Sequence, residues 1–292
     1  MTQTDLQGEA ALAPPARTRI KLPDTRLLIG ATGVGLIVLL ALLAPLLAPY
    51  DPNAQHLAAR LRPPSPQYPL GTDHLGRDLL SRLLYGLRPS LLSGLAAVML
   101  AGVFGTAIGV VAGYFRGVPD ALIGRVLDLL IAWPAIFIAL ALVLLLGPGP
   151  TGIVIAIGLA ELPVFARVAR AVTLANTGLL HVEAAVSIGA STPRIMLRHI
   201  LPFAIPPLIV QFAIAAPQAV IAEASLSFLG LGTQPPDPSL GAMVSNALLY
   251  LSRSIYGALV PIATIAVLIL CLTLLADGLQ ETLDPKRRMR RG

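Results

Sequence analysis

The sequence predicts an all-α integral membrane protein with six transmembrane helices. Hydrophobic residues make up 55% of the 292 residues and charged residues only 12%, and the mean hydropathy is +0.79. A soluble protein of this length carries about twice this share of charged residues. The apolar residues also gather in long uncharged stretches, which must form helices in lipid because the backbone there has no water to bond. We therefore reject a soluble protein with a large buried helical core.

Each uncharged stretch is long enough to cross a membrane, since a spanning helix needs about 20 apolar residues. The longest one contains the sequence GPGPTG at 147–152, whose glycines and prolines are typical of a turn. This stretch therefore divides into a span near 126–146 and another near 153–173, which brings the expected total to six. The uncharged stretches are 27–50, 89–115, 129–160, 200–222 and 254–276.

The distribution of lysine and arginine predicts that both termini are cytoplasmic. With the N-terminus inside, the cytoplasmic segments are 1–26, 116–128, 167–199 and 277–292, and they hold 15 of the 21 lysine and arginine residues. Cytoplasmic loops carry such an excess. The outer segment 51–88 also contains arginines, but long segments weigh less in this rule. The net charge of +6 is thus explained by cytoplasmic loops, and we expect no nucleic-acid partner.

We expect the first apolar stretch to be an uncleaved anchor, because it is longer than the apolar region of a signal peptide. The rest of the chain is then divided by the spans. The expected parts are a cytoplasmic tail (1–26), a first anchor helix (27–48), an extracytoplasmic segment (49–88), a five-helix core (89–277) with a cytoplasmic loop at 174–202, and a basic cytoplasmic tail (278–292).

The residues needed for catalysis are missing from the sequence. A phosphate-binding P-loop needs a lysine directly after a glycine, and the only lysines, Lys21 and Lys286, follow isoleucine and proline. Any ATP hydrolysis must therefore belong to another chain. The four histidines are scattered, and the single cysteine, Cys271, lies within the last span. We expect no catalytic residue, no metal site and no cofactor on this chain.

The cytoplasmic loop contains the sequence EAAVSIGASTPRIMLRHILP at 183–202, which predicts a compact helix-turn-helix. The first helix should end at Gly189, because glycine commonly follows the last residue of a helix. Pro193 suits the first turn of a second helix, with Ser191 or Thr192 as its N-cap. This second helix then leads into the next span.

Two interpretations of this loop stay open at the level of its residues. In one, small side chains at Ala184, Ala185 and Gly189 allow a partner protein to approach, and Glu183 contributes a single anchoring charge. In the other, the loop is an amphipathic segment that lies on the bilayer surface.

Three segments resemble a known family. The pattern of EAA, three residues, glycine and a later Leu-Pro resembles the EAA loop of ABC importer permeases. The segments PLGTDHLGRDLLSRLLYGLRPSL (69–91) and AEASLSFLGLGTQPPDPSLGAM (222–243) resemble the dipeptide/oligopeptide/nickel branch of that family. The chain is therefore similar to the C-type permease subunit of such importers. His199 stands where the family has isoleucine two positions before Leu-Pro.

The resemblance implies the type I ABC importer permease fold, in which the loop docks on a cytoplasmic ATPase and transmits its motion. It implies as partners a sister permease, two ABC ATPase subunits that bind ATP and Mg, an extracytoplasmic solute-binding protein and the lipid bilayer. The loop residues implicated are Glu183, Ala184, Ala185, Gly189, Pro193, Arg194, Leu201 and Pro202.

The implied function is import of dipeptides or oligopeptides across the bacterial cytoplasmic (inner) membrane, by a transport subunit that is not itself an enzyme. A nickel-chelate or glutathione importer is an alternative. A stand-alone secondary transporter is a further one, but it would require an internal repeat and more buried ionisable groups.

Four polar residues in the predicted spans are candidates for the substrate pathway. An ionisable group inside a membrane is costly and is a functional candidate by default, which singles out Glu161. Alternatively, Glu161 pairs with Arg167 or with a sister subunit, or it carries a proton. Gln211 and Gln218 are seven residues apart and share a helix face, which suits either a pathway or interhelical hydrogen bonds. Glu223 is expected to have a structural or gating role near the outer mouth.

The outer segment contains alternating charges at Asp73, Arg77 and Asp78. We expect these side chains to pair locally, although they could also meet a binding protein.

Overall fold

The computed structural model describes residues 25–283, and nearly all of its regular structure is helical. The predicted tail 1–26 and the basic sequence KRRMRR lie wholly or almost wholly outside the described residues. The helices are α1 (Thr25–Leu42), α2 (Ala44–Leu47), η1 (Leu57–Ala59), α3 (Leu79–Phe115), α4 (Gly117–Ala132), α5 (Ala135–Leu146), α6 (Pro150–Asn176), α7 (Leu180–Ser187), α8 (Thr192–Ile195), η2 (Met196–Ile200), α9 (Leu201–Phe228), α10 (Leu240–Leu248) and α11 (Tyr256–Leu283).

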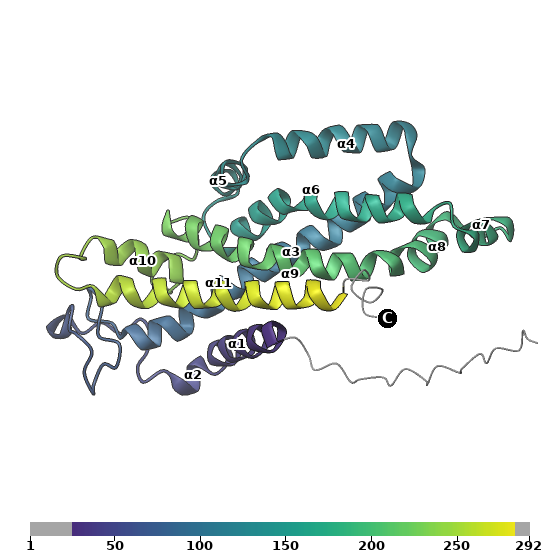
Figure 1. Cartoon of the computed structure of the whole chain (residues 1–292). Helices are drawn as coiled ribbons and strands as arrows, with labels where there is room; N and C mark the ends of the chain where they lie inside the picture. Colours follow the sequence, from purple (N-terminus) through teal and green to yellow (C-terminus); the bar gives the residue numbers. More distant parts are fainter. Residues whose placement is uncertain (1–24, 284–292) are drawn as a thin grey trace, which may run out of the picture.

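The long helices α3, α6, α9 and α11 run lengthwise through an elongated bundle (Figure 1). The helices α7 and α8 lie at one end of the bundle, and α10 lies toward the other end (Figure 1). The first residues of α1 and the last residues of α11 point toward the end with α7 and α8. Five helical segments are long and apolar enough to cross a membrane: α1, α3, α6, the continuous segment Thr192–Phe228, and α11.

The region predicted as the span 126–146 is not a single straight helix. The chain instead forms α4 and α5, whose axes differ by 93° at a short break, so that α5 is seen end-on in Figure 1. The break follows from Pro134, which has no N–H to donate and forces the preceding residue out of the helical conformation. Trp133 accordingly has an extended backbone, with φ −100° and ψ 142°. A sixth span is obtained only if this bent pair counts as one span.

The core of the bundle is the contact between α3 and α6, and small residues make it close. Gly105, Gly109 and Gly113 lie on one face of α3 against α6. A Cβ at Gly105 would lie 2.7 Å from the carbonyl oxygen of Leu162, and one at Gly113 would lie 2.8 Å from the Cβ of Thr173. In lipid, the hydrophobic effect does not drive apolar helices together, so they associate through such close packing.

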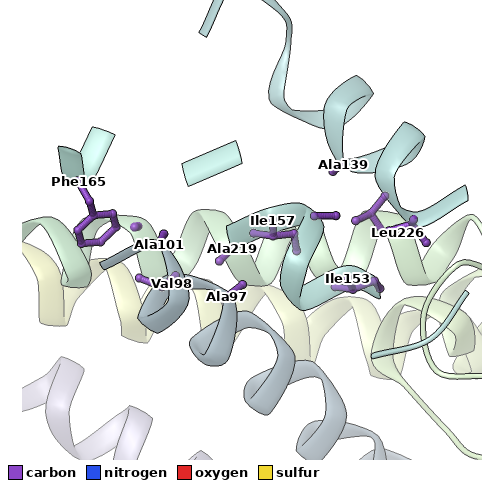
Figure 2. Packing of buried hydrophobic residues seen from close by; sticks show 12 residues of the cluster. Ala97, Val98, Ala101, Ala139, Ile153, Ile157, Phe165, Ala219 and Leu226 are labelled. Atoms are coloured by element: carbon purple, nitrogen blue, oxygen red, sulfur yellow. The ribbon is translucent and has the colours of Figure 1, made fainter. Parts of the chain in front are cut away.

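Buried side chains from four helices fill the centre of the bundle (Figure 2). Phe165 and Ile157 of α6 pack there with residues of α3 and α9, and α5 contributes to the same cluster. The members labelled in Figure 2 are Ala97, Val98, Ala101, Ala139, Ile153, Ile157, Phe165, Ala219 and Leu226.

The helices α1 and α11 also lie side by side through small residues, although they are far apart in the sequence (Figure 1). A Cβ at Gly30 would lie 2.7 Å from the Cα of Leu275, and one at Gly278 would lie 2.6 Å from the Cα of Leu27. The predicted anchor helix is therefore fixed to the bundle through α11.

We predict that Gly109→Ala destabilises the fold by about 1–3 kcal/mol, the usual cost of overpacking. Its new methyl group would collide with the carbonyl of Ala166 and lie 2.8 Å from the Cβ of Ala169. Gly124→Ala is the matched control, since nothing lies within 4 Å of a Cβ there. Thermal unfolding of the full chain in detergent measures both variants, and equal unfolding temperatures would contradict the proposed packing.

Candidate functional site

The loop between α6 and α9 begins with the short helix α7 and a glycine turn. Gly189 has a φ of +76°, in the left-handed region that glycine adopts without strain. The N–H of Ala190 donates to the carbonyl of Ala185 at 3.0 Å, and that of Gly189 to Val186 at 2.9 Å. These bonds form the typical end of a helix closed by a left-handed residue. The predicted helix and turn are confirmed.

The second half of the loop passes into the membrane helix without a break. Ser191 is the N-cap of α8, although its side chain makes no capping bond. The π-helical turn η2 follows and is closed by the N–H of Leu201, which donates to the carbonyl of Met196. Such π turns are rare and occur frequently at functional sites. Pro202, which has no N–H, comes directly after this turn.

His199 lies within the π turn. Its carbonyl is 3.4 Å from Nε2 of His181, whose ring packs against Phe203 with the ring centroids 5.1 Å apart. Its backbone therefore contacts the first helix of the loop, and its side chain is half-buried.

The loop has a small hydrophobic core of its own. Val182, Ala185, Ile195 and Ile200 are all buried and pack together with Tyr114 at the end of α3. The expectation that Ala185 leaves room for a partner is wrong, because it is 4% exposed and faces this core. The loop is therefore a folded unit attached to α3.

The opposite side of the loop exposes large apolar side chains. Leu180 is 83% exposed and Ile188 84%. Val186 is also exposed, as are the predicted site residues Glu183, Ala184, Gly189, Pro193, Arg194 and Pro202, whereas Leu201 is half-buried. Sequence reasoning missed the apolar tip, although Leu180, Val186 and Ile188 fall between the buried positions of the same helix and turn. An exposed apolar patch of this kind marks an interaction surface.

Polar contacts fix the loop to the ends of α3 and α6. Arg116 joins α3 to α4 with a φ of +51°, a conformation that is strained for a residue with a side chain. One of its terminal nitrogens donates to Oγ1 of Thr177 at 2.5 Å, where α6 ends. In addition, Arg170 of α6 makes two bonds to Asp120 of α4, at 2.5 and 2.6 Å.

A largely apolar groove of about 770 Å³ runs from the loop along the bundle. Pro193, Met196 and Leu201 line it at the loop, and Phe165 and Phe212 line it further along α6 and α9. The groove was not predicted, because it depends on the spacing between three helices rather than on any one segment.

The structure separates the four pathway candidates rather than gathering them. Glu161 is half-buried on α6 and has no hydrogen bond or ion pair to the described residues. The alternative in which it pairs with Arg167 is wrong, since Arg167 bonds Asp128 of α4 at 2.7 Å. On α9, Gln211 is half-buried and Gln218 is exposed.

Glu223 is 1% exposed, and its Oε1 accepts a bond from Oγ of Ser227 at 2.7 Å. Its Oε2 is buried and has no partner among residues 25–283. Glu223 is therefore held inside the bundle by hydroxyl groups and is not on an open surface.

Charged side chains that were predicted to pair locally lie just before α3 and at its beginning. Nε of Arg77 donates to Asp73 at 2.6 Å, and Nε of Arg82 lies 3.7 Å from the same carboxylate. Asp78 is the N-cap of α3 and accepts from the N–H of Ser81 at 2.7 Å. The predicted local pairing is confirmed for Asp73 and Arg77, whereas Asp78 bonds Ser81 rather than an arginine.

His74 belongs to the same region and stacks on Tyr250 with ring centroids 4.9 Å apart. Burial lowers the pKa of His74, and the nearby Arg77 acts in the same direction, although Asp73 opposes them. Within residues 25–283 there is no group of three histidine, cysteine, aspartate or glutamate side chains that could hold a metal ion.

The lowered pKa of His74 predicts that the fold loses stability in mild acid. Above the ordinary histidine pKa of about 6.5 the ring is neutral in both states, and its favourable contribution is fully present. As the pH falls below that value, the unfolded chain takes up the proton first, so stability declines until the lowered pKa is reached. His74→Phe keeps a ring on Tyr250 and should flatten this part of the curve. Unfolding temperatures measured from about pH 7 to about pH 5 test this, and parallel curves for the two proteins would contradict it.

Two family models match separate parts of the chain. The family model for the binding-protein-dependent transport system inner membrane component matches residues 105–289. The model for the N-terminal TM domain of oligopeptide transport permease C matches residues 25–64.

Two relatives cover most of the chain. The di/tripeptide transport system permease protein of Pseudomonas aeruginosa is 42% identical over 257 residues, covering 86% of this chain and 85% of the relative. The glutathione transport system permease protein of Pectobacterium atrosepticum is 41% identical over 261 residues, covering 88% and 87%.

The fold matches that of a chain of the MetNI methionine ABC transporter in an inward-facing conformation. The TM-score is 0.56 at 16% sequence identity, over 69% of this chain and 96% of that one. The predicted permease fold is confirmed, and the family accounts for a multi-pass inner-membrane transport component, rather than an enzyme, that works with an ATPase and a binding protein. The chain belongs to the binding-protein-dependent transport system inner membrane component family, as a permease subunit of an ABC importer.

Proposed function

We propose that the chain forms half of a pathway for dipeptides or oligopeptides, together with a sister permease and two ATPase subunits. The relatives named above transport di/tripeptides and glutathione, so small peptides and glutathione-like compounds are the favoured substrates. A nickel chelate stays the alternative within the same class of importer. The observation that carries the proposal is the exposed apolar tip at Leu180, Val186 and Ile188, on a chain without a P-loop of its own.

The tip is the surface for the ATPase in this proposal. Glu183 and Arg194 flank it as exposed charges, and Ala184 and Gly189 allow a close approach. The buried core of the loop and its contact with Tyr114 support transmission of motion to α3. The π turn continues into α9, and Arg116 connects to the end of α6. A displacement of the loop would thus act on three membrane helices together.

The end of the bundle that carries α7 and α8 is cytoplasmic in this proposal. Each of the six spans then has one end next to a segment that carries lysine or arginine, and these segments together hold 15 of the 21 such residues, as the positive-inside rule requires. The beginning of α1 and the end of α11 point toward that same end (Figure 1), so both tails would be cytoplasmic. The anchor helix (27–48), the outer segment (49–88) and the core (89–277) keep their proposed bounds.

The substrate pathway is proposed to run past Glu161, Gln211 and Gln218, with Glu223 positioning the outer end of α9. Glu161 supports this best, because a half-buried carboxylate with no partner among the described residues is free to meet a cationic group of a substrate.

We predict that Ile188→Asp lowers uptake and the amount of co-purified ATPase about tenfold, because hot-spot apolar residues at interfaces contribute on this order. Leu251→Asp is the matched control, since Leu251 is an exposed leucine in the turn after α10, at the other end of the bundle. Pull-down of the ATPase and uptake in proteoliposomes measure both. An unaffected Ile188→Asp, or uptake without any ATPase, would overturn the proposal.

We predict that Glu161→Gln lowers the uptake of lysine-containing dipeptides about tenfold relative to neutral ones, by removing an attraction of roughly 1.4 kcal/mol. Asp128→Asn is the control, because its carboxylate is already paired with Arg167 and exposed. Competition uptake assays with the cognate binding protein give the ratio. An unchanged substrate profile would remove Glu161 from the pathway.

A further inference from the structure

A small polar cavity lies at the outer end of the bundle, where the extracytoplasmic segment meets α10 and α11. Arg77 and Arg82 line it from one side, and Asn246 and Ser254 line it from the other. Its volume is about 20 Å³, which holds one particle the size of a water molecule. The ring of Tyr250 also lines the cavity and stacks on His74, so the two rings form part of its wall.

The lining of this cavity carries more positive than negative charge. Arg77 is 6% exposed and Arg82 is 4% exposed. Asp73 is the one carboxylate among the lining residues, and it serves both guanidinium groups. Asp78 is directed to the backbone N–H and hydroxyl of Ser81 instead. Buried charges are costly unless they are paired. Because one carboxylate is shared by two guanidinium groups, the remaining positive charge favours the binding of an anion.

Other negative and positive groups near the arginines lie outside the lining. Asp237 accepts from Asn53 at 3.2 Å and is exposed. A terminal nitrogen of Arg82 donates to the carbonyl of Pro52 at 2.9 Å. Arg60 is exposed and donates to the carbonyl of His74. None of these contacts supplies a counter-ion inside the cavity.

Ser254 provides an independent indication of a ligand. It is 8% exposed, and its buried Oγ has no hydrogen-bond partner among the described residues. A buried hydroxyl without a partner is unfavourable, because it has lost the hydrogen bonds that water would make. The amide of Asn246 lines the same space. The cavity thus offers hydroxyl, amide and guanidinium donors to a single small acceptor.

We propose that this cavity binds one monatomic halide anion, chloride under ordinary conditions. The anion balances the positive charge of the second guanidinium group and accepts a hydrogen bond from the hydroxyl of Ser254. Phosphate, sulfate and carboxylates are excluded because the space admits about one water-sized particle. The bound halide joins Arg77, just before α3, and Arg82 of α3 to Asn246 of α10 and Ser254 in the turn before α11. It thereby holds the outer end of the bundle together.

The first test is thermal unfolding of the full-length chain in sodium chloride, sodium bromide and sodium gluconate at equal ionic strength. Chloride and bromide are expected to raise the unfolding temperature in a saturable manner, whereas gluconate is too large to enter. Equal unfolding temperatures in all three salts would overturn the proposal and leave the cavity to a water molecule.

The second test uses variants and anomalous diffraction. Ser254→Ala should weaken the apparent halide affinity about tenfold by removing one donor, and leave stability in gluconate nearly unchanged. Ser252→Ala, at an exposed serine of the same turn, is the matched control and should bind as the parent does. Crystals grown in bromide should give an anomalous peak between Arg77 and Ser254. Absence of that peak, or an unchanged affinity of Ser254→Ala, would overturn the assignment.

Discussion

The close contact between α3 and α6 is the interaction on which the rest of the structure depends. It requires residues without side chains at Gly105, Gly109 and Gly113, because the carbonyls and side chains of α6 occupy that space. The contact also fixes where α3 ends. Tyr114 and Arg116 at that end contact the loop between α6 and α9, Tyr114 through the hydrophobic core of the loop and Arg116 through Thr177. Packing inside the membrane therefore determines how the loop is presented outside it.

Polar interactions are concentrated at the two ends of the bundle, where their desolvation costs less. At one end, Asp73 and the arginines around it attach the long connecting segment to α3. At the other end, Arg170 and Asp120 attach α4 to α6. Of the two acids Glu161 on α6 and Glu223 on α9, only Glu223 is surrounded by the protein.

The sequence was sufficient for the features that depend on one segment, and insufficient for those that depend on several. The Gly189 turn and the pairing of Asp73 with Arg77 were predicted because near neighbours in the chain make them. The break at Pro134 was not predicted, because a proline does not always break a helix. Pro89, Pro163 and Pro261 all lie inside unbroken helices. Neighbouring helices decide whether a proline is accommodated. The inward orientation of Ala185 and the apolar groove were missed for the same reason: both depend on contacts between elements.

The pairing of α1 with α11 has a consequence for the order in which the chain is assembled. The two helices stand at opposite ends of the described sequence. The glycines at their contact bring the two backbones so close that a side chain at either position would collide with the other helix. During synthesis from the N-terminus, α1 enters the membrane first and must wait in lipid until α11 has been made. Contacts of such long sequence separation form slowly. This pair can therefore form only after the helices between α1 and α11 have been made, and the membrane must hold α1 in place until then.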